Sequence, residues 1–172
     1  MPETQSPLWL DKVKDMIRVL FVCHGNICRS AMAEAMFRKM VKEKGLQDQI
    51  EIDSAATSTE EIGNPMYPPA VRMLQKEGVP VGCHRARQLT ARDYDRFDLL
   101  IGMDDANIRN MTRICRGDPS GKIHKLLEYA GDTGSIADPW YTDDFETCYR
   151  DLSRSLSPLL DTGTITVIFG IE

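Results

Sequence analysis

A cysteine and an arginine, Cys23 and Arg29, stand near the start of the chain with five residues between them. A cysteine thiolate is a strong nucleophile, and a guanidinium presents a planar fork of N–H donors that fits two oxygens of a phosphate. The spacing predicts a loop that binds a tetrahedral dianion, with the sulfur placed for in-line displacement through a phosphocysteine intermediate. The predicted phosphate-binding loop consists of Cys23, His24, Gly25, Asn26, Ile27, Cys28, Arg29 and Ser30.

The residues on either side of this loop predict a strand before it and a helix after it. Residues 17–22 form a nearly continuous apolar run, which is typical of a strand covered on both faces in a parallel sheet. Ser30 begins a segment with apolar residues at helical spacing that ends at Gly45. Open α/β sheets bind ligands at this end of a strand, and a helix N-terminus favours an oxyanion. Ser30 either caps the helix or donates a hydrogen bond to the thiolate.

The rest of the chain repeats the alternation of strands and helices. Further strands are predicted near residues 50–52, 98–101 and 122–126, and further helices near residues 69–77, 105–114 and 144–160. This order predicts a single α/β domain with a four-stranded parallel sheet and helices on both faces, in a flavodoxin-like arrangement. We expect the domain to span residues 16–160, between an N-terminal tail (residues 1–15) and a C-terminal tail or extra edge strand (residues 161–172, with strand character at 164–171).

Length and composition exclude several classes of function. The 172 residues carry 21 Lys and Arg against 26 Asp and Glu, so the net charge of -5 has the wrong sign for attraction to nucleic acid or anionic lipid. The sequence contains neither an apolar run long enough to span a membrane nor the pattern of a signal peptide. We therefore expect a cytoplasmic monomer that binds neither nucleic acid nor membrane.

The cysteines do not suggest a disulfide framework or a metal site. Five cysteines are an odd number, and Cys83, Cys115 and Cys148 are expected to be inert packing residues. No Cys-x-x-Cys pair occurs and the three histidines are scattered, so no metal or other cofactor is expected.

The segment VLFVCHGNICRSAMAEAMF resembles the low-molecular-weight protein tyrosine phosphatases, which are related to the arsenate reductases. The family signature Cys-x-Gly-Asn-x-Cys-Arg-Ser is matched from Cys23 to Ser30. The motifs IDSAATS, HRARQLT, FDLLIGMD and ADPWYTDDFE follow in the family's order, so the resemblance covers roughly residues 16–160. It implies hydrolysis of phosphotyrosine, in proteins or peptides, and of small aryl phosphates. Inorganic phosphate is then the product and a competitive ligand.

The resemblance also implies that Asp138 is the general acid and base of this reaction. An Asp-Pro pair followed by aromatic residues is, in an unknown chain, more typical of a turn with packed rings. In the family, however, the general acid lies in such a loop, and Trp140 and Tyr141 would then form the wall of a cleft for a flat substrate ring. Asp104 is expected to cap a helix, and its charge would help to keep Asp138 protonated if the two carboxyl groups lie close together.

Three further residues resemble the family's supporting shell around the loop. Asn26 tolerates the left-handed backbone that such a loop requires. Ser54 is expected to form a hydrogen bond with Asn26, and His84 is expected to orient the hydroxyl of Ser30. A histidine that is simply buried and hydrogen-bonded is the alternative for His84.

Cysteine chemistry separates this chain from one group of relatives. Cys28 matches the family's second loop cysteine, which forms a reversible disulfide with Cys23, although packing alone would also explain it. Arsenate reductases pass a disulfide through two further cysteines on a segment after the third strand. Here that segment contains Cys115 only, so the relay is not evident.

The residues expected around the cleft bear on the choice of substrate. Arginine phosphatases have Thr at the position of Ile27, and the apolar Ile27 favours a phenyl ring instead. The family often has an aromatic residue near Glu60, and the acidic residue found here favours basic phosphopeptides. His24 occupies a variable loop position from which it can donate to ligands. Arsenate reduction, arginine phosphatase activity and a catalytically silent, phosphoprotein-binding role stay open as alternatives.

Overall fold

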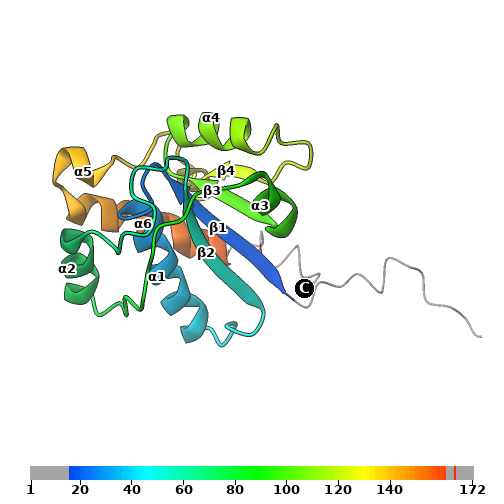
Figure 1. Ribbon diagram of the computed structural model, residues 1–172. Helices are drawn as coiled ribbons and strands as arrows, with labels where there is room; N and C mark the ends of the chain where they lie inside the picture. Colours follow the sequence, from blue (N-terminus) through cyan, green and yellow to red (C-terminus); the bar gives the residue numbers. More distant parts are fainter. Residues whose placement is uncertain (1–15, 162–164, 166–172) are drawn as a thin grey trace, which may run out of the picture.

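Four parallel strands form a sheet in the order β2-β1-β3-β4 in the computed structural model, which describes residues 16–161 and 165 (Figure 1). The strands are β1 (Ile17–Cys23), β2 (Ile50–Ala56), β3 (Leu99–Gly102) and β4 (Ile123–Lys125). The helices are α1 (Arg29–Glu43), α2 (Pro68–Lys76), α3 (Ala91–Arg96), α4 (Asp105–Ile114), the 3-10 helix η2 (Leu126–Ala130), α5 (Pro139–Thr142) and α6 (Phe145–Asp161). The predicted fold class is confirmed.

The central strand β1 is buried on both faces, which explains its continuous apolar run. Val19 and Phe21 belong to the hydrophobic cluster under α1, α2 and α6. Leu20 and Val22 belong to a second cluster, under α3 and α4 on the opposite face (Figure 1). Successive side chains of a strand point to opposite faces, so a strand between two helical layers needs apolar residues at every position.

The structure extends one predicted strand and adds three short helices. β2 has seven residues and pairs with β1 along its whole length, although Asp53 and Ser54 interrupt the apolar run from which it was predicted. The helices α3, η2 and α5 have six, five and four residues, too few to show helical periodicity in a sequence.

The predicted tails lie almost entirely outside the described residues. This holds for residues 1–15 and for most of residues 162–172. Within the segment 164–171 the structure describes Ile165, whose side chain is buried and whose backbone is helical. Of the two alternatives, tail or edge strand, the strand is therefore wrong at this residue. None of the helices in the described part of the chain is long and apolar enough to cross a membrane.

The carboxyl end of the sheet gathers the segments that carry the expected chemistry. β1 ends at Cys23, and α1 begins at Arg29 after a five-residue connection. β3 leads to Asp104, the residue that caps α4. Asp138 caps α5, and the backbone of Ile136 is tied to this edge by its hydrogen bond to the carbonyl of Met103 (2.9 Å).

Candidate active site

The sulfur of Cys23 lies at the centre of a set of hydrogen bonds within the loop. The backbone N–H of Asn26 donates to Cys23 Sγ at 3.3 Å, and Ser30 Oγ lies 3.0 Å from the same sulfur. The Nδ2 group of Asn26 donates to Ser30 Oγ at 2.8 Å, which leaves the Ser30 hydroxyl proton free to point at the sulfur. Two hydrogen-bond donors therefore converge on the sulfur of Cys23.

Two details of the loop explain how these donors are held. Asn26 is buried and has the left-handed backbone that the sequence predicts, with a φ of 60°. Ser30 is the second residue of α1 and does not cap it, because the N-cap position belongs to Cys28 and lacks a side-chain hydrogen bond. Of the two roles predicted for Ser30, the structure therefore favours the contact with Cys23.

The guanidinium of Arg29 is buried between two carboxyl groups. Its Nη1 donates to Asp104 Oδ2 at 2.7 Å and to the carbonyl oxygen of Ile136 at 2.9 Å, and its Nη2 donates to Asp138 Oδ2 at 3.4 Å. Burial alone would lower the pKa of Arg29, but the negative charges of Cys23, Asp104 and Asp138 outweigh it and raise this pKa. Arg29 is therefore a permanent cation close to the sulfur of Cys23.

Asp104 and Asp138 face the same guanidinium, but they are held differently. The other oxygen of Asp104 accepts the N–H of Asn107 at 2.7 Å and so caps α4. The other oxygen of Asp138 accepts the N–H of Trp140 at 3.0 Å in the short helix α5. The sequence left open whether these two carboxyl groups lie close together, and in the structure both contact the guanidinium of Arg29.

Cys23, Arg29 and Asp138 all line one open cavity, whose empty space of about 510 Å³ includes the solvent at its mouth. The cavity is lined by Cys23, His24, Gly25, Ile27, Cys28, Arg29, Glu60, Glu61, Asp138, Trp140 and Tyr141. All four residues predicted for the substrate cleft are among them, and Glu61 is an addition. Trp140 is half exposed and packs on the ring of Tyr67, with 4.9 Å between the ring centroids, whereas Tyr141 is 81% exposed.

Two acidic residues, Glu60 and Glu61, form part of the rim of the cavity. Glu60 forms an exposed contact with His24, whose Nε2 lies 3.1 Å from Glu60 Oε2. Glu61 accepts a hydrogen bond of 2.6 Å from Asn64 Nδ2. His24 thus faces a carboxylate of the protein itself, at the position from which it was expected to donate to a ligand.

Two contacts expected in the supporting shell are wrong. The hydroxyl of Ser54 donates to Glu34 Oε1 on α1 at 2.8 Å instead of reaching Asn26. His84 Nε2 lies 2.6 Å from the carbonyl oxygen of Asn26 instead of contacting the hydroxyl of Ser30. Both residues still lie beside the loop, but His84 acts on its backbone and Ser54 on the neighbouring helix.

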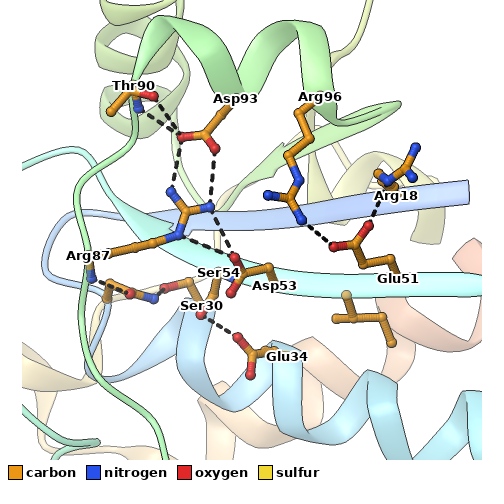
Figure 2. A network of polar contacts seen from close by, with 12 residues as sticks. Arg18, Ser30, Glu34, Glu51, Asp53, Ser54, Arg87, Thr90, Asp93 and Arg96 are labelled. Atoms are coloured by element: carbon orange, nitrogen blue, oxygen red, sulfur yellow. Dashed lines mark hydrogen bonds and ion pairs between the residues drawn. The ribbon is translucent and has the colours of Figure 1, made fainter.

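The sequence did not single out Arg87, which lies at the centre of a second polar network (Figure 2). The backbone N–H of Arg87 donates to Asn26 Oδ1 at 3.2 Å. Its guanidinium donates to Asp53 on β2 and to Asp93 on α3, with four hydrogen bonds of 3.1–3.2 Å. Burial alone would lower the pKa of Arg87, but Asp93 and Asp53 raise it.

All five cysteines are free, and their surroundings differ. Cys28 lies in the loop, where burial and the neighbouring Cys23 raise the pKa of its thiol far above the usual value. Burial raises the pKa of Cys148 to about 12 and that of Cys115 to about 11. Cys83 is exposed. Within residues 16–161, together with residue 165, no group of three His, Cys, Asp or Glu is arranged to hold a metal ion.

Comparison with known proteins gives consistent matches over nearly the whole domain. The family model for low molecular weight phosphotyrosine protein phosphatase matches residues 18–165. The chain is 42% identical over 147 residues to the low molecular weight protein-tyrosine-phosphatase YfkJ of Bacillus subtilis, which covers 84% of this chain and 94% of that relative. It is 40% identical over 152 residues to the low molecular weight phosphotyrosine protein phosphatase of Homo sapiens. That alignment covers 83% of this chain and 93% of the relative.

Solved structures match the fold equally well. The crystal structure of YfkJ from Bacillus subtilis superposes with a TM-score of 0.83 at 39% identity and covers 86% of this chain and 94% of that chain. The Drosophila arginine phosphatase DARP superposes with a TM-score of 0.79 at 29% identity and covers 86% of this chain and 98% of that chain. Proteins named for two different substrates thus share this fold, and the residues of the cavity must distinguish them.

Proposed function

Since the chain belongs to the low molecular weight phosphotyrosine protein phosphatase family and is a phosphoric monoester hydrolase, we propose that Cys23, Arg29 and Asp138 carry its reaction. The observation that carries this proposal is the convergence of all three residues on one cavity, with two hydrogen-bond donors directed at the sulfur of Cys23. The substrate is a phosphotyrosine side chain in a protein or peptide.

In the first step, the thiolate of Cys23 attacks the phosphorus and forms the S–P bond as the P–O bond to tyrosine breaks. The N–H groups of the loop and the guanidinium of Arg29 hold the equatorial oxygens and stabilise their charge in the transition state. Asp138, in its protonated form, gives its proton to the tyrosine oxygen as it leaves. Its 3.4 Å contact with Arg29 is the longest that the guanidinium makes, so little energy is lost when Asp138 turns to the leaving group.

In the second step, Asp138 is a carboxylate and accepts a proton from a water molecule. The water oxygen attacks the phosphorus, the S–P bond breaks, and Cys23 returns to its thiolate form as inorganic phosphate is released. The Ser30 hydroxyl, held by Asn26, stabilises the departing thiolate at 3.0 Å. Inorganic phosphate fits the same set of donors and is therefore a competitive inhibitor.

The choice of tyrosine as substrate is supported by the apolar and aromatic part of the cavity. Ile27, Trp140 and Tyr141 line it together and offer flat and apolar contacts to a phenyl ring. A phosphoarginine side chain has no ring, so it would make fewer contacts with these apolar and aromatic side chains.

We propose a preference for basic residues next to the phosphotyrosine. Glu60 and Glu61 line the rim, and the exposed contact of Glu60 with His24 is weak enough for a substrate cation to replace it. Acidic flanking residues would be repelled by the same two carboxylates.

We propose that Cys28 protects Cys23 from over-oxidation by forming a disulfide with it after an oxidant such as hydrogen peroxide has converted Cys23 to a sulfenic acid. The Cys28 thiol would displace water from that sulfenic acid. Thiol reductant is then expected to restore activity after peroxide treatment in the parent enzyme and much less in Cys28→Ala.

We also propose that the enzyme works as a monomer in the cytoplasm. The five free cysteines favour a reducing compartment, where thiols stay unpaired. Light scattering in solution gives the mass that tests the monomer.

Replacement of the nucleophile tests the proposed reaction. Cys23→Ser is expected to abolish hydrolysis of p-nitrophenyl phosphate, because the hydroxyl is a poor nucleophile at neutral pH. Cys83→Ser is the matched control, since Cys83 is exposed and does not line the cavity. Full turnover by Cys23→Ser would exclude the proposal.

A further inference from the structure

A segment without helix or strand structure lies beside the phosphate-binding loop at the carboxyl end of the sheet, and we call residues 84–90 the strap. It is tied to the end of β2, because Ala56 donates its N–H to the carbonyl of Arg87 and accepts the N–H of Leu89, both at 2.7 Å. The resulting bridge pairs Ala56 with Gln88 in parallel. The strap is thus joined to the edge of the sheet at the end of β2 by one parallel bridge.

The strap holds Asn26 from two sides. The backbone N–H of Arg87 donates to Asn26 Oδ1 at 3.2 Å, and His84 Nε2 lies 2.6 Å from the Asn26 carbonyl oxygen. Asn26 in turn donates its N–H to Cys23 Sγ and its Nδ2 to Ser30 Oγ, the oxygen that contacts the same sulfur. An unbroken path of hydrogen bonds therefore joins the strap to the nucleophile. A left-handed backbone is uncommon outside glycine even where asparagine tolerates it, and contacts of this kind help to keep Asn26 in place.

The guanidinium of Arg87 fixes the strap to two other elements. It bridges Asp53 of β2 and Asp93 of α3, and Asp93 also accepts the N–H of Thr90 at 2.8 Å in the capping box of α3 (Figure 2). Without Arg87, two carboxylates would face each other across the strap without their shared cation. Besides the backbone hydrogen bonds to Ala56, the guanidinium of Arg87 is thus the side-chain anchor that joins the strap to both β2 and α3.

We propose that Arg87 is a positioning residue of the phosphatase reaction, which anchors the strap so that Asn26 and Ser30 keep their donors on the sulfur of Cys23. Arg87 does not line the cavity and acts through these residues, without contacting substrate. The inference rests on the proposed role of Cys23 as the nucleophile.

The test uses Arg87→Met, which keeps the apolar stem and removes the cation. The readout is the rate of Cys23 alkylation by iodoacetamide as a function of pH, followed by mass spectrometry of the Cys23 peptide. In Arg87→Met the profile is expected to move to higher pH, because the thiolate loses part of its hydrogen bonding. The substitution leaves the other charged or titratable groups near the sulfur unchanged, which are His24, Cys28, Arg29, Asp138 and Cys148. A shift of the alkylation profile therefore measures the effect of the strap on Cys23.

Kinetics of p-nitrophenyl phosphate hydrolysis provide the second readout. The value of kcat/KM is expected to fall about tenfold, the size of one lost hydrogen bond to a charged group. Arg96→Met is the matched control, because Arg96 of α3 also binds a carboxylate of β2, Glu51, at 2.6 Å, but makes no contact with the strap or the loop among the described residues (Figure 2). We expect Arg96→Met to keep the parent alkylation profile and kcat/KM.

A folded Arg87→Met protein with the parent alkylation profile would overturn the proposal. If this variant does not fold, Arg87→Lys retains a cation between the carboxylates without the two-armed fork, and a smaller shift in the same direction is expected. The parent profile in Arg87→Lys would then overturn it. Alkylation needs no turnover, so failure of the proposed function shows separately, as phosphatase activity in Cys23→Ser.

Discussion

Arg29 and Arg87 each bind two aspartates, but the two arginines lie in different surroundings. The side chain of Arg29 is 2% exposed and makes three hydrogen bonds with its five N–H groups, one of them as long as 3.4 Å. The side chain of Arg87 is 37% exposed and makes four, all between 3.1 and 3.2 Å. The buried guanidinium is thus the less completely bound of the two.

This difference supports the two proposed roles, phosphate binding for Arg29 and anchoring of the strap for Arg87. A buried cation with N–H groups to spare is costly unless an anion completes its shell, and Arg29 faces the cavity where a phosphate would do so. Arg87 already has its partners and links the strap to β2 and α3. We infer that incomplete pairing, more than burial or the number of aspartates, marks the substrate-binding arginine.

Exchange of each arginine for lysine is expected to give the largest difference between Arg29 and Arg87. Arg29→Lys is expected to lower kcat/KM for aryl phosphates at least about a hundredfold, because an ammonium cannot present parallel donors to two phosphate oxygens. Arg87→Lys is expected to lose less than about tenfold, because a cation between the carboxylates still holds most of the strap. Steady-state kinetics at one pH on both purified variants give the two values. Equal losses would mean that the two arginines do not differ in role.

The next largest effect is expected at Asp138, which is the more loosely held of the two aspartates that contact Arg29. Asp138→Asn is expected to slow hydrolysis of phenyl phosphate about a hundredfold, since its phenolate needs a proton to leave. In kcat/KM, which reports the steps up to formation of the phosphocysteine, a nitrophenyl phosphate, whose leaving group is far more stable, should lose much less. The measurement is kcat/KM against leaving-group acidity over a series of aryl phosphates. Asp143→Asn, next to the same short helix, is the control. A uniform loss across the series would exclude Asp138 as the acid.

The acidic rim is expected to give the smallest effect. Neutralising both carboxylates in Glu60→Gln/Glu61→Gln should reduce the preference for a basic over an acidic phosphotyrosine peptide by about threefold to tenfold, since exposed charges interact weakly. The ratio of kcat/KM for the two peptides is the quantity to measure, and in the parent enzyme it should shrink as salt is added. Glu43→Gln on the exposed side of α1 is the control. An unchanged ratio in the double variant contradicts a role for the rim.

The sequence predicted the site residues whose roles depend on their near neighbours along the chain. Cys23 and Arg29 are separated by a short loop between a strand and a helix, so their spacing carries information about how they meet. The left-handed backbone at Asn26 is also a local property, because asparagine tolerates it better than most residues. The resemblance to the family was needed for Asp138, whose distance from Cys23 along the chain leaves no local signal.

The contacts that the sequence missed depend on how distant segments meet. Whether Ser54 reaches Asn26 or Glu34 depends on how α1 is rotated against β2, and no spacing in the sequence gives that angle. Arg87 lies 34 residues from Asp53 and 61 from Asn26, and its role appears only when the strap, β2 and α3 are assembled. Glu61 was missed for a simpler reason, since only one of two adjacent acidic residues was assigned to the rim.

The phosphoryl group is proposed to pass through Cys23, and trapping of the phosphocysteine is the most direct test. The parent enzyme is mixed with excess p-nitrophenyl phosphate, quenched within milliseconds and digested, and the peptides are analysed by mass spectrometry. We expect one phosphoryl group on the peptide that contains Cys23, at a higher level in Asp138→Asn, because loss of the base slows hydrolysis of the intermediate more than loss of the acid slows its formation from this activated substrate. A phosphoryl group on any other residue would contradict a phosphocysteine intermediate. So would turnover of the substrate without a phosphoryl group on Cys23 in either the parent enzyme or Asp138→Asn.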